Sequence, residues 1–537
     1  MPITNYSLAI PHAYAPKLFP TRMLHPQLPH PQLNILLQSI TPKALPITPK
    51  ALQGILTSLV ITYYSLTGVI LAKFRNALTH KPSLRPKDMR KQRRSPPARL
   101  IALSFAAAIV IGTILLWLPF SQRPDQNVSL LDALFTATSA VCVTGLEVTS
   151  TVLTFNRFGQ SIILLLIKLG GLGLVTFGTL FALAFGRAIG YGARLLVAEQ
   201  VSAPKLGGVL PLVRNIVLLS LAVESVGALL MYPAFQQTNP HDAAFYAMFH
   251  SVSAFNNAGF SLYPDSLVRF VGNPRISLII TLLFVAGGLG FVVVSDVWRV
   301  LLNVRLHASR WRVQQLSLHS KITLLTTVTL LIVPIPLFLL FEWHNTLAGL
   351  SMTDKLLASF FQVATPRTAG FNTLAYGDMG SPALLLTMFL MFIGGSPGST
   401  AGGVKTVTLF VVMVIAWHLM RGSSTVVLFG RTLSLETAMK AAVLTIIAAT
   451  VIGVTATMLF FLQPNIDSLA LAFEVVSAFS TVGLSVGITA DLDASSKLII
   501  VLLMYVGRLG PLTLALALMQ TQPKKVLEYP QENVLIG

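Results

Sequence analysis

Four short runs of the chain combine hydroxyl or amide side chains with a glycine, a combination that can present oxygen atoms to a cation. Each run has a phenylalanine ten residues before its glycine. The glycines Gly145, Gly259, Gly370 and Gly483 are spaced by 114, 111 and 113 residues. This long, regular period predicts four structural repeats, each of which contributes one run. The runs read FTATSAVCVTGL (135–146), FHSVSAFNNAGF (249–260), FFQVATPRTAGF (360–371) and FEVVSAFSTVGL (473–484).

The glycines suggest how the runs could bind a cation. Glycine permits backbone angles that turn successive carbonyl groups to one side of the chain, and a ring of such carbonyls can replace the hydration shell of an ion. The alternative is that these glycines only allow close packing between membrane helices. We favour ion binding because all four runs stand in register, each after a short apolar segment and before a long one.

The composition is that of a polytopic membrane protein. Hydrophobic residues make up 54% of the chain and charged residues only 11%, with a mean hydropathy of +0.73, whereas soluble domains carry roughly 25% charged residues. The net charge of +19 is concentrated in residues 1–98, which hold seven Lys and six Arg against one Asp. This distribution argues against nucleic-acid binding. The single cysteine, Cys142, excludes a disulfide within the chain.

The elements around each run also repeat, in the order long span, half-length helix, glycine run and second span. About 20 apolar residues cross a bilayer, so the sequence predicts an all-α membrane protein with eight spans and four re-entrant helices around one central pore. First spans are expected at 100–120, 212–234, 322–341 and 438–462; short helices at 130–139, 241–254, 353–364 and 467–478; and second spans at 161–185, 276–298, 383–417 and 498–519.

These units divide the chain into a first repeat at 99–186, a second at 187–302, a third at 303–420 and a fourth at 421–537. We predict that residues 1–98 are a disordered, basic extension, in which 52–72 is a weak span, an interfacial helix or a targeting segment. A biological start at Met89 is an open alternative. The links between units are basic and the glycine runs have acidic neighbours. The links are therefore expected in the cytoplasm, as are both termini if 52–72 does not span.

A second glycine cluster, GGSPGSTAGG at 394–403, interrupts the long segment of the third unit. Its five glycines and Pro397 cannot continue a helix cheaply, so we expect either a packing kink or a polar loop that lines a cavity. Arg508 lies near the middle of the last span, where a charge is costly and usually functional. We expect it to face the pore below the glycine runs rather than to snorkel, with Lys405 at the same site.

Three acidic residues within apolar segments receive no site role. Glu224 and Asp296 lie in spans, where pairing or an interfacial position would explain them. Glu474 is expected to begin the fourth short helix, where an acid complements the helix dipole.

Together these motifs resemble the Ktr/Trk/HKT superfamily of potassium transporters, most closely the membrane subunit of bacterial Ktr uptake systems. The resemblance rests on SAFNNAGFSLYPD, TPRTAGFN, FEVVSAFSTVGL, GGSPGSTAGGVK and GRLGPLT, and it covers residues 89–537. It implies K⁺ uptake through a four-loop selectivity filter in a bacterial plasma membrane. The filter residues implied are Val143, Thr144, Gly145, Asn257, Ala258, Gly259, Thr368, Ala369, Gly370, Thr481, Val482 and Gly483.

The resemblance has further implications. Residues 394–404 would form an intramembrane loop that gates the pore. A homodimer, a cytoplasmic ring of nucleotide-binding regulatory subunits, stimulation by Na⁺ and no organic cofactor are also implied. In this family a serine at the first glycine accompanies sodium permeation, so four glycines favour K⁺, although Cys142 replaces a usual hydroxyl residue. The gating residues implied are Gly394, Gly395, Ser396, Gly398, Gly402, Gly403, Lys405 and Arg508.

Three other functions are alternatives to potassium uptake. A Na⁺-selective or weakly selective cation transporter of the same fold is the main alternative. A secondary transporter with a midplane site fits less well, because its halves are commonly inverted. An enzyme is suggested only by the G-x-S-x-G pattern at 394–398, which needs a strand-to-helix elbow or a histidine partner. Since His418 is the only histidine after Ser396, we expect no enzymatic activity.

Overall fold

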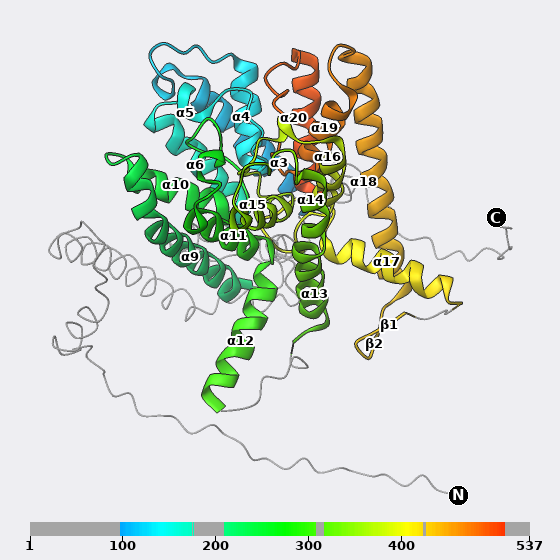
Figure 1. Cartoon of the computed structure of the whole chain (residues 1–537). Coiled ribbons are helices and arrows are strands. Elements are labelled where there is room, and N and C mark those ends of the chain that lie inside the picture. The colour runs from blue at the N-terminus through cyan, green and yellow to red at the C-terminus, as the bar shows by residue number, and fades with distance from the viewer. Residues whose placement is uncertain (1–96, 174–175, 177–208, 308–315, 423–425, 511–537) are drawn as a thin grey trace, which may run out of the picture. The chain divides into compact units, whose positions relative to one another are not determined.

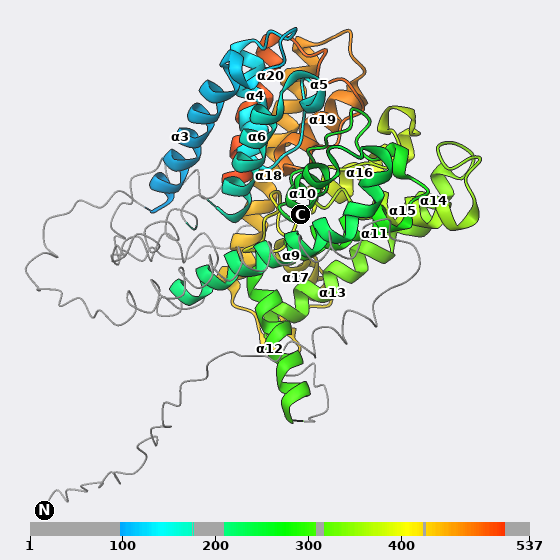
Figure 2. The same ribbon diagram turned by 90° about the vertical axis from the view of Figure 1, so that its left-hand side faces the viewer.

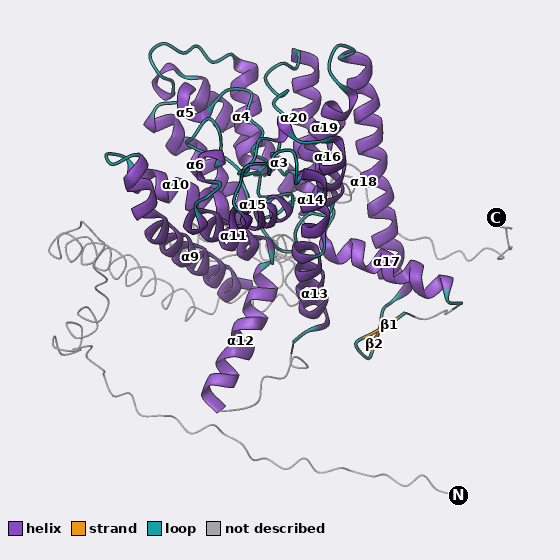
Figure 3. Cartoon of the chain, viewed as in Figure 1, coloured by secondary structure: helices purple, strands orange, loops and turns teal. Residues whose placement is uncertain are grey.

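The computed structural model describes residues 97–173, 176, 209–307, 316–422 and 426–510, all of which belong to one compact unit. The predicted basic extension at 1–96, with its segment 52–72 and Met89, lies outside the described residues. The described part is almost entirely helical (Figure 3). The exception is a two-stranded hairpin that the sequence did not predict, in which β1 (Val427–Leu428) pairs antiparallel with β2 (Arg431–Thr432).

The helices follow the predicted order in each unit (Figure 1). In the first two units a long helix is followed by a short helix, the glycine run and a further helix. The first unit contains α3 (Pro97–Trp117), η2 (Pro119–Ser121), α4 (Leu130–Cys142), α5 (Thr151–Thr154) and α6 (Arg157–Leu172). The second contains α9 (Val209–Thr238), α10 (Ala243–Phe255), η4 (Val268–Phe270), α11 (Pro274–Gly288) and α12 (Phe291–His307).

The third and fourth units have the same order, with a broken helix at the end of the third. The third contains α13 (Leu318–Ile332), α14 (Pro334–Glu342), α15 (Met352–Ala364), η6 (Tyr376–Asp378), α16 (Ser381–Phe392) and α17 (Thr406–Met420). The fourth contains α18 (Leu435–Leu462), α19 (Ser468–Ser480) and α20 (Ala494–Leu509).

Four helices in the described part are long and apolar enough to cross a membrane, and they open the four units as predicted. They cover Ala98–Trp117, Val213–Thr238, Leu318–Glu342 and Glu436–Leu462. Their exposed positions include many large apolar side chains, such as Ile111 on α3 and Ile446 on α18. Such an outer surface suits lipid rather than water.

The second spans of the first, second and fourth units are not the continuous helices that the sequence led us to expect, whereas the break in the third unit was predicted. α6 ends before Gly173 (φ +84°), and α11 and α12 meet at a bend of 101° beside Gly290 (φ +88°). α16 ends before Gly394, and the C-cap of α20 is Gly510 (φ +81°). Glycine adopts left-handed angles without the steric penalty of a side chain, and Gly173, Gly290 and Gly510 each take such an angle where a helix ends or bends.

Three of the short helices follow residues whose side chains cap them, whereas Asp242 before α10 makes no such bond. Ser129, Ser351 and Asp467 accept hydrogen bonds from the backbone of the first turns of α4, α15 and α19, as N-cap residues commonly do. The expected position of Glu474 is therefore wrong. α19 begins at Ser468, which places Glu474 in the middle of that helix.

The four units pack in a closed circuit. The helix after each glycine run contacts the short helix of the next unit, so α6 packs on α10, α11 on α15, α16 on α19, and α20 on α4. The last contact joins the two ends of the described chain, and Figure 2 shows the red helix α20 beside the blue and cyan α4. Phe135, Phe249 and Phe473, which begin three of the runs, are fully buried.

Candidate functional site

The four glycine runs share an unusual backbone. We define the glycine turns as residues 143–145, 257–259, 368–370 and 481–483. Each begins and ends in the left-handed region, which residues with a Cβ rarely adopt. The φ values at the first positions are +58° (Val143), +59° (Asn257), +70° (Thr368) and +51° (Thr481), and those at the glycines are +95° (Gly145), +73° (Gly259), +77° (Gly370) and +89° (Gly483).

The glycines of the four turns form a closed ring. A Cβ placed on Gly259 would lie 2.8 Å from Gly370 Cα, and one placed on Gly483 would lie 2.8 Å from Gly145 Cα. A Cβ on Gly145 would lie 3.1 Å from Gly259 Cα, and one on Gly370 would meet the carbonyl oxygen of Val482. Residues more than 330 positions apart in the sequence are therefore neighbours, and glycine is required at every corner.

The carboxyl ends of the short helices hold the turns in place. Backbone N–H groups of three turns donate to carbonyl groups five residues back: Thr144 to Ser139 (2.8 Å), Ala258 to Ser253 (2.8 Å) and Val482 to Ser477 (2.9 Å). This is how helices commonly end at a left-handed residue. The third turn differs, because Ala369 N–H donates to the Thr365 carbonyl (2.9 Å).

Hydroxyl groups on the short helices support the same turns. The N–H groups of Gly145 and Gly483 donate to Ser139 Oγ (3.0 Å) and Ser477 Oγ (3.1 Å). Ser253 Oγ donates to the Phe260 carbonyl (2.8 Å), and Thr365 Oγ1 donates to the Phe371 carbonyl (2.5 Å). These residues were not predicted from the sequence. A hydroxyl residue stands six positions before the glycine in three runs and five positions before it in the third, and that spacing could have found them.

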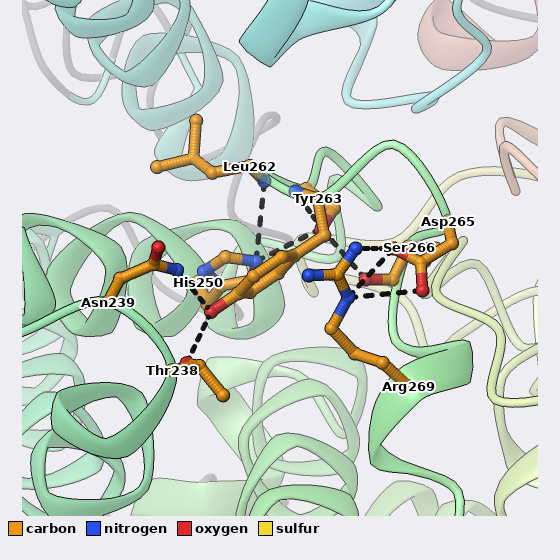
Figure 4. Close-up of polar contacts among 9 residues, drawn as sticks. Thr238, Asn239, His250, Leu262, Tyr263, Asp265, Ser266 and Arg269 are labelled. Carbon is orange, nitrogen blue, oxygen red and sulfur yellow. Dashed lines mark hydrogen bonds and ion pairs between the residues drawn. The ribbon is translucent and has the colours of Figure 1, made fainter.

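A polar side chain nine residues before the glycine supports the second turn from outside. His250 Nδ1–H donates to the Tyr246 carbonyl (2.8 Å), and its Nε2 accepts from the Leu262 N–H (3.4 Å) and lies 3.1 Å from Ser261 Oγ (Figure 4). Because Nε2 accepts the Leu262 hydrogen bond, this histidine is neutral. Glu474, at the same spacing in the fourth run, accepts from Thr489 Oγ1 (2.5 Å).

The turns also present side-chain oxygens. The buried hydroxyls of Thr144, Thr368 and Thr481 make no hydrogen bond within the described part of the chain. Buried polar groups usually have a partner. Unpaired hydroxyl oxygens and the carbonyl groups of the turns are the kinds of ligand that suit an alkali cation.

The predicted intramembrane loop, residues 394–404, lies between α16 and α17 and touches two other units. Two backbone hydrogen bonds join the loop to the second unit. Ser396 N–H donates to the Gly288 carbonyl (3.0 Å), and Phe291 N–H donates to the Gly398 carbonyl (3.1 Å). On the fourth unit, a Cβ on Gly402 would lie 3.1 Å from Thr481 Cβ, and one on Gly403 would lie 3.3 Å from the Ser480 carbonyl oxygen. The loop thus lies against two of the glycine turns.

The remaining residues of the loop make contacts within the loop. Gly394 N–H donates to the Val404 carbonyl (2.9 Å), and Gly395 leaves no room for a Cβ beside Ala401. Ser396 is fully buried and its hydroxyl has no partner among the described residues. Since α16 precedes this segment, it is a helix break and not the strand-to-helix elbow that a G-x-S-x-G nucleophile needs.

Both predicted basic residues bind this loop. Arg508 on α20 donates through Nη1 to the Thr400 carbonyl and through Nη2 to the Gly170 carbonyl (2.5 Å). Lys405 Nζ donates to the carbonyls of Ala401 (2.7 Å) and Gly402 (3.4 Å). Arg508 therefore joins the loop to the first unit. Its position facing a pore stays a prediction.

Glycines in the helices that follow the turns allow those helices to pack closely against the ends of the short helices. A Cβ on Gly170, Gly287 or Gly507 would collide with the carbonyl of Val141, Phe255 or Phe479, respectively, each of which stands four residues before the ring glycine. Gly170 and Gly287 are therefore packing residues. Their expected position inside continuous spans is wrong, since both stand just before a helix end or bend.

This architecture, with long apolar helices and short helices that end at a ring of glycine turns, defines an integral membrane protein. The chain belongs to the TrkH family of cation transport proteins, whose sequence pattern matches residues 68–528. This identification agrees with the superfamily that the sequence motifs resemble.

Characterised relatives cover most of the chain. It is 38% identical to the Ktr system potassium uptake protein B of Bacillus subtilis, over 83% of this chain and 97% of that protein. It is also 37% identical to the potassium/sodium uptake protein NtpJ of Enterococcus hirae, over 83% of this chain and 99% of the relative. The solved structure of the potassium transporter TrkH from Vibrio parahaemolyticus shares its fold, with a TM-score of 0.61 and 20% identity over 86% of this chain and 97% of that one.

Proposed function

We propose that this chain takes up potassium, and that K⁺ passes through the four glycine turns. The observation that carries the proposal is the closed ring of Gly145, Gly259, Gly370 and Gly483, in which backbone carbonyls approach from four directions. Carbonyl oxygens in such a ring can replace water around K⁺. The short helices point their carboxyl ends, which carry partial negative charge, at the same ring. Relatives named as potassium uptake proteins support this choice of ion.

The intramembrane loop is proposed as the gate. It lies against the second and fourth turns, and Arg508 and Lys405 place two positive charges beside it. Its glycines allow it to change shape at low cost. We propose that the loop obstructs the route of the ion away from the turns, and that movement of the loop opens that route.

The regulation of transport is part of the same proposal. Two relatives are named as protein B of a Ktr system, a name that indicates further components. We therefore include a homodimer and a cytoplasmic ring of nucleotide-binding subunits that acts on the loop. Stimulation by Na⁺ is also included, because one relative is named a potassium/sodium uptake protein.

The test is rescue of a bacterium that lacks potassium uptake, combined with flux measurements in proteoliposomes. Gly483→Ser should weaken growth at low K⁺ and lower the ratio of K⁺ to Na⁺ flux, because the new Cβ would lie 2.8 Å from Gly145 Cα. Gly487→Ser is the matched control. Gly487 also has a positive φ (+102°) but has no atom within 4 Å of an added Cβ.

Equal K⁺ selectivity in both variants, at equal protein levels, would contradict the assignment of the filter. Selective flux of Na⁺ by the unaltered protein would replace the proposed function by that of a sodium transporter of the same fold.

A further inference from the structure

A buried ion pair lies beside the second glycine turn. Lys168 Nζ on α6 is 2.5 Å and 2.6 Å from the two carboxylate oxygens of Glu224 on α9. Only 14% and 5% of these side chains are exposed. Removing two charges from water costs several kcal/mol each, which a buried pair does not reliably recover. Packing alone therefore does not explain the pair, and its other contacts indicate what it does.

The Glu224 carboxylate accepts hydrogen bonds from residues of three helices. Besides Lys168, it accepts from Ser220 Oγ on α9 (3.0 Å) and from Asn256 Nδ2 at the end of α10 (2.9 Å). Asn256 directly precedes the second glycine turn. A Cβ on Gly171 would lie 2.8 Å from Asn256 Cβ, so α6 confines the same side chain by contact while Glu224 holds it by a hydrogen bond.

The contacts continue from Asn256 through the turn to the loop and back to α6. Asn257 Oδ1 accepts from Thr400 Oγ1 of the intramembrane loop (2.8 Å). The carbonyl of Thr400 accepts from Arg508, whose second nitrogen donates to Gly170. Gly170 stands two residues after Lys168 on α6. The ion pair, the second turn and the loop thus belong to one closed set of contacts.

This arrangement is confined to the second unit. The residues that correspond to Asn256 in the other units, three positions before the glycine, are Cys142, Arg367 and Ser480. Arg367 donates to Thr327, and the Ser480 hydroxyl has no partner within the described residues. Asn256 alone among the four is held by a buried carboxylate in the described structure. The ion pair therefore acts on one turn rather than on the ring as a whole.

We propose that Glu224, charge-balanced by Lys168, is a positioning residue that fixes Asn256 and thereby sets the geometry of the second turn for K⁺. The inference rests on the proposed function, because it assumes that the turn contacts the transported ion. According to this proposal, the affinity for K⁺ depends on the hydrogen bond from Asn256 to Glu224 and not on the charges of the ion pair.

Two double variants separate the hydrogen bond from the charges. Lys168→Met with Glu224→Gln removes both charges and keeps an oxygen for Asn256, whereas Lys168→Met with Glu224→Leu removes both charges and that oxygen. Neither leaves an uncompensated charge, and Gln and Leu are of similar size. We expect the KM for K⁺ uptake to be roughly three- to tenfold higher for the Leu variant than for the Gln variant, because the Asn256 amide then keeps only its hydrogen bond to the Val252 carbonyl (2.8 Å) and loses the one that ties it to α9. The ratio of K⁺ to Na⁺ flux should fall with it.

Asn256→Ala tests the same bond from the other side and keeps the inference falsifiable if the Leu variant does not accumulate. It should raise KM similarly, and adding it to the Leu variant should produce little further change, as expected for residues that act through one contact. Equal KM and equal selectivity for the Gln and Leu variants, or an unchanged KM in Asn256→Ala, would overturn the inference. Gly483→Ser is measured alongside, since unchanged selectivity in that variant would instead reject the proposed filter.

Discussion

The hydroxyl of Thr400 donates a hydrogen bond of 2.8 Å to the side-chain oxygen of Asn257, 143 residues earlier in the chain. The carbonyl of the same threonine accepts a hydrogen bond from Arg508. One loop residue is therefore tied to the second glycine turn by its side chain and to the last helix by its backbone. Release of the loop requires both bonds to break.

Thr400→Val should weaken this attachment. Valine has nearly the same shape but no hydroxyl, so the side-chain bond to Asn257 is lost while the Arg508 contact to the backbone remains. A hydrogen bond of about 1 kcal/mol corresponds to a roughly fivefold change in an equilibrium, so we expect the initial rate of K⁺ uptake into proteoliposomes to rise about two- to tenfold. Thr406→Val is the control, because the buried hydroxyl of Thr406 makes no hydrogen bond within the described chain. An equal uptake rate in both variants would contradict the idea that the bond from Thr400 to Asn257 restrains the loop.

Ser477→Ala tests the support that α19 gives to the fourth turn. The substitution leaves the Gly483 N–H without its acceptor, and an unpaired buried donor costs about 1–3 kcal/mol. We expect a lower thermal midpoint in detergent and a lower ratio of K⁺ to Na⁺ flux. Ser359→Ala on α15 removes an equally buried hydroxyl that has no partner among the described residues. If both variants lose the same selectivity, the effect does not come from the bond to Gly483.

The four units, their short helices and the positions of the ring glycines could be predicted because each repeats a local pattern. The N-cap residues of three short helices are Ser129, Ser351 and Asp467, residue types that favour the start of a helix. The interruption at 394–403 was likewise predicted, since its glycines and proline disfavour a helix whatever surrounds them.

What could not be predicted depends on contacts between units. Gly170 and Gly287 were expected inside continuous spans, but the helices break or bend just after them, where they meet the ends of α4 and α10. Glu224 had no assigned role, because its partners Lys168 and Asn256 lie 56 and 32 residues away on other helices. Only the folded arrangement shows which polar residues of different units are neighbours.

Gly507→Ala should damage the packing of α20 against α19. The added methyl group would lie 2.8 Å from the Phe479 carbonyl carbon, which is backbone and cannot turn away. Overpacking of this kind costs about 1–3 kcal/mol, so we expect a lower thermal midpoint and less purified protein. Gly453→Ala on α18 is the control, since an added Cβ there has no atom within 4 Å. Equal losses in both variants would show that helical glycine itself, and not the contact with Phe479, is required.

The ion pair between Asp265 and Arg269 in the second unit should make stability depend on pH. Partial burial alone would raise the pKa of Asp265, but the hydrogen bonds from Arg269 outweigh it and hold this pKa below its ordinary value (Figure 4), which is about 3.9. A carboxyl group whose pKa is lowered by folding stabilises the protein above its ordinary pKa, and this contribution is lost as the pH falls through the folded value. Because the pair is largely exposed, the loss is at most about 1 kcal/mol. The thermal midpoint is measured at pH 7 and at about pH 3. The decrease between the two pH values should be smaller for Asp265→Asn than for the unaltered protein. Adding Arg269→Gln to Asp265→Asn should change that decrease little. An identical fall in all three proteins would show that this pair does not contribute.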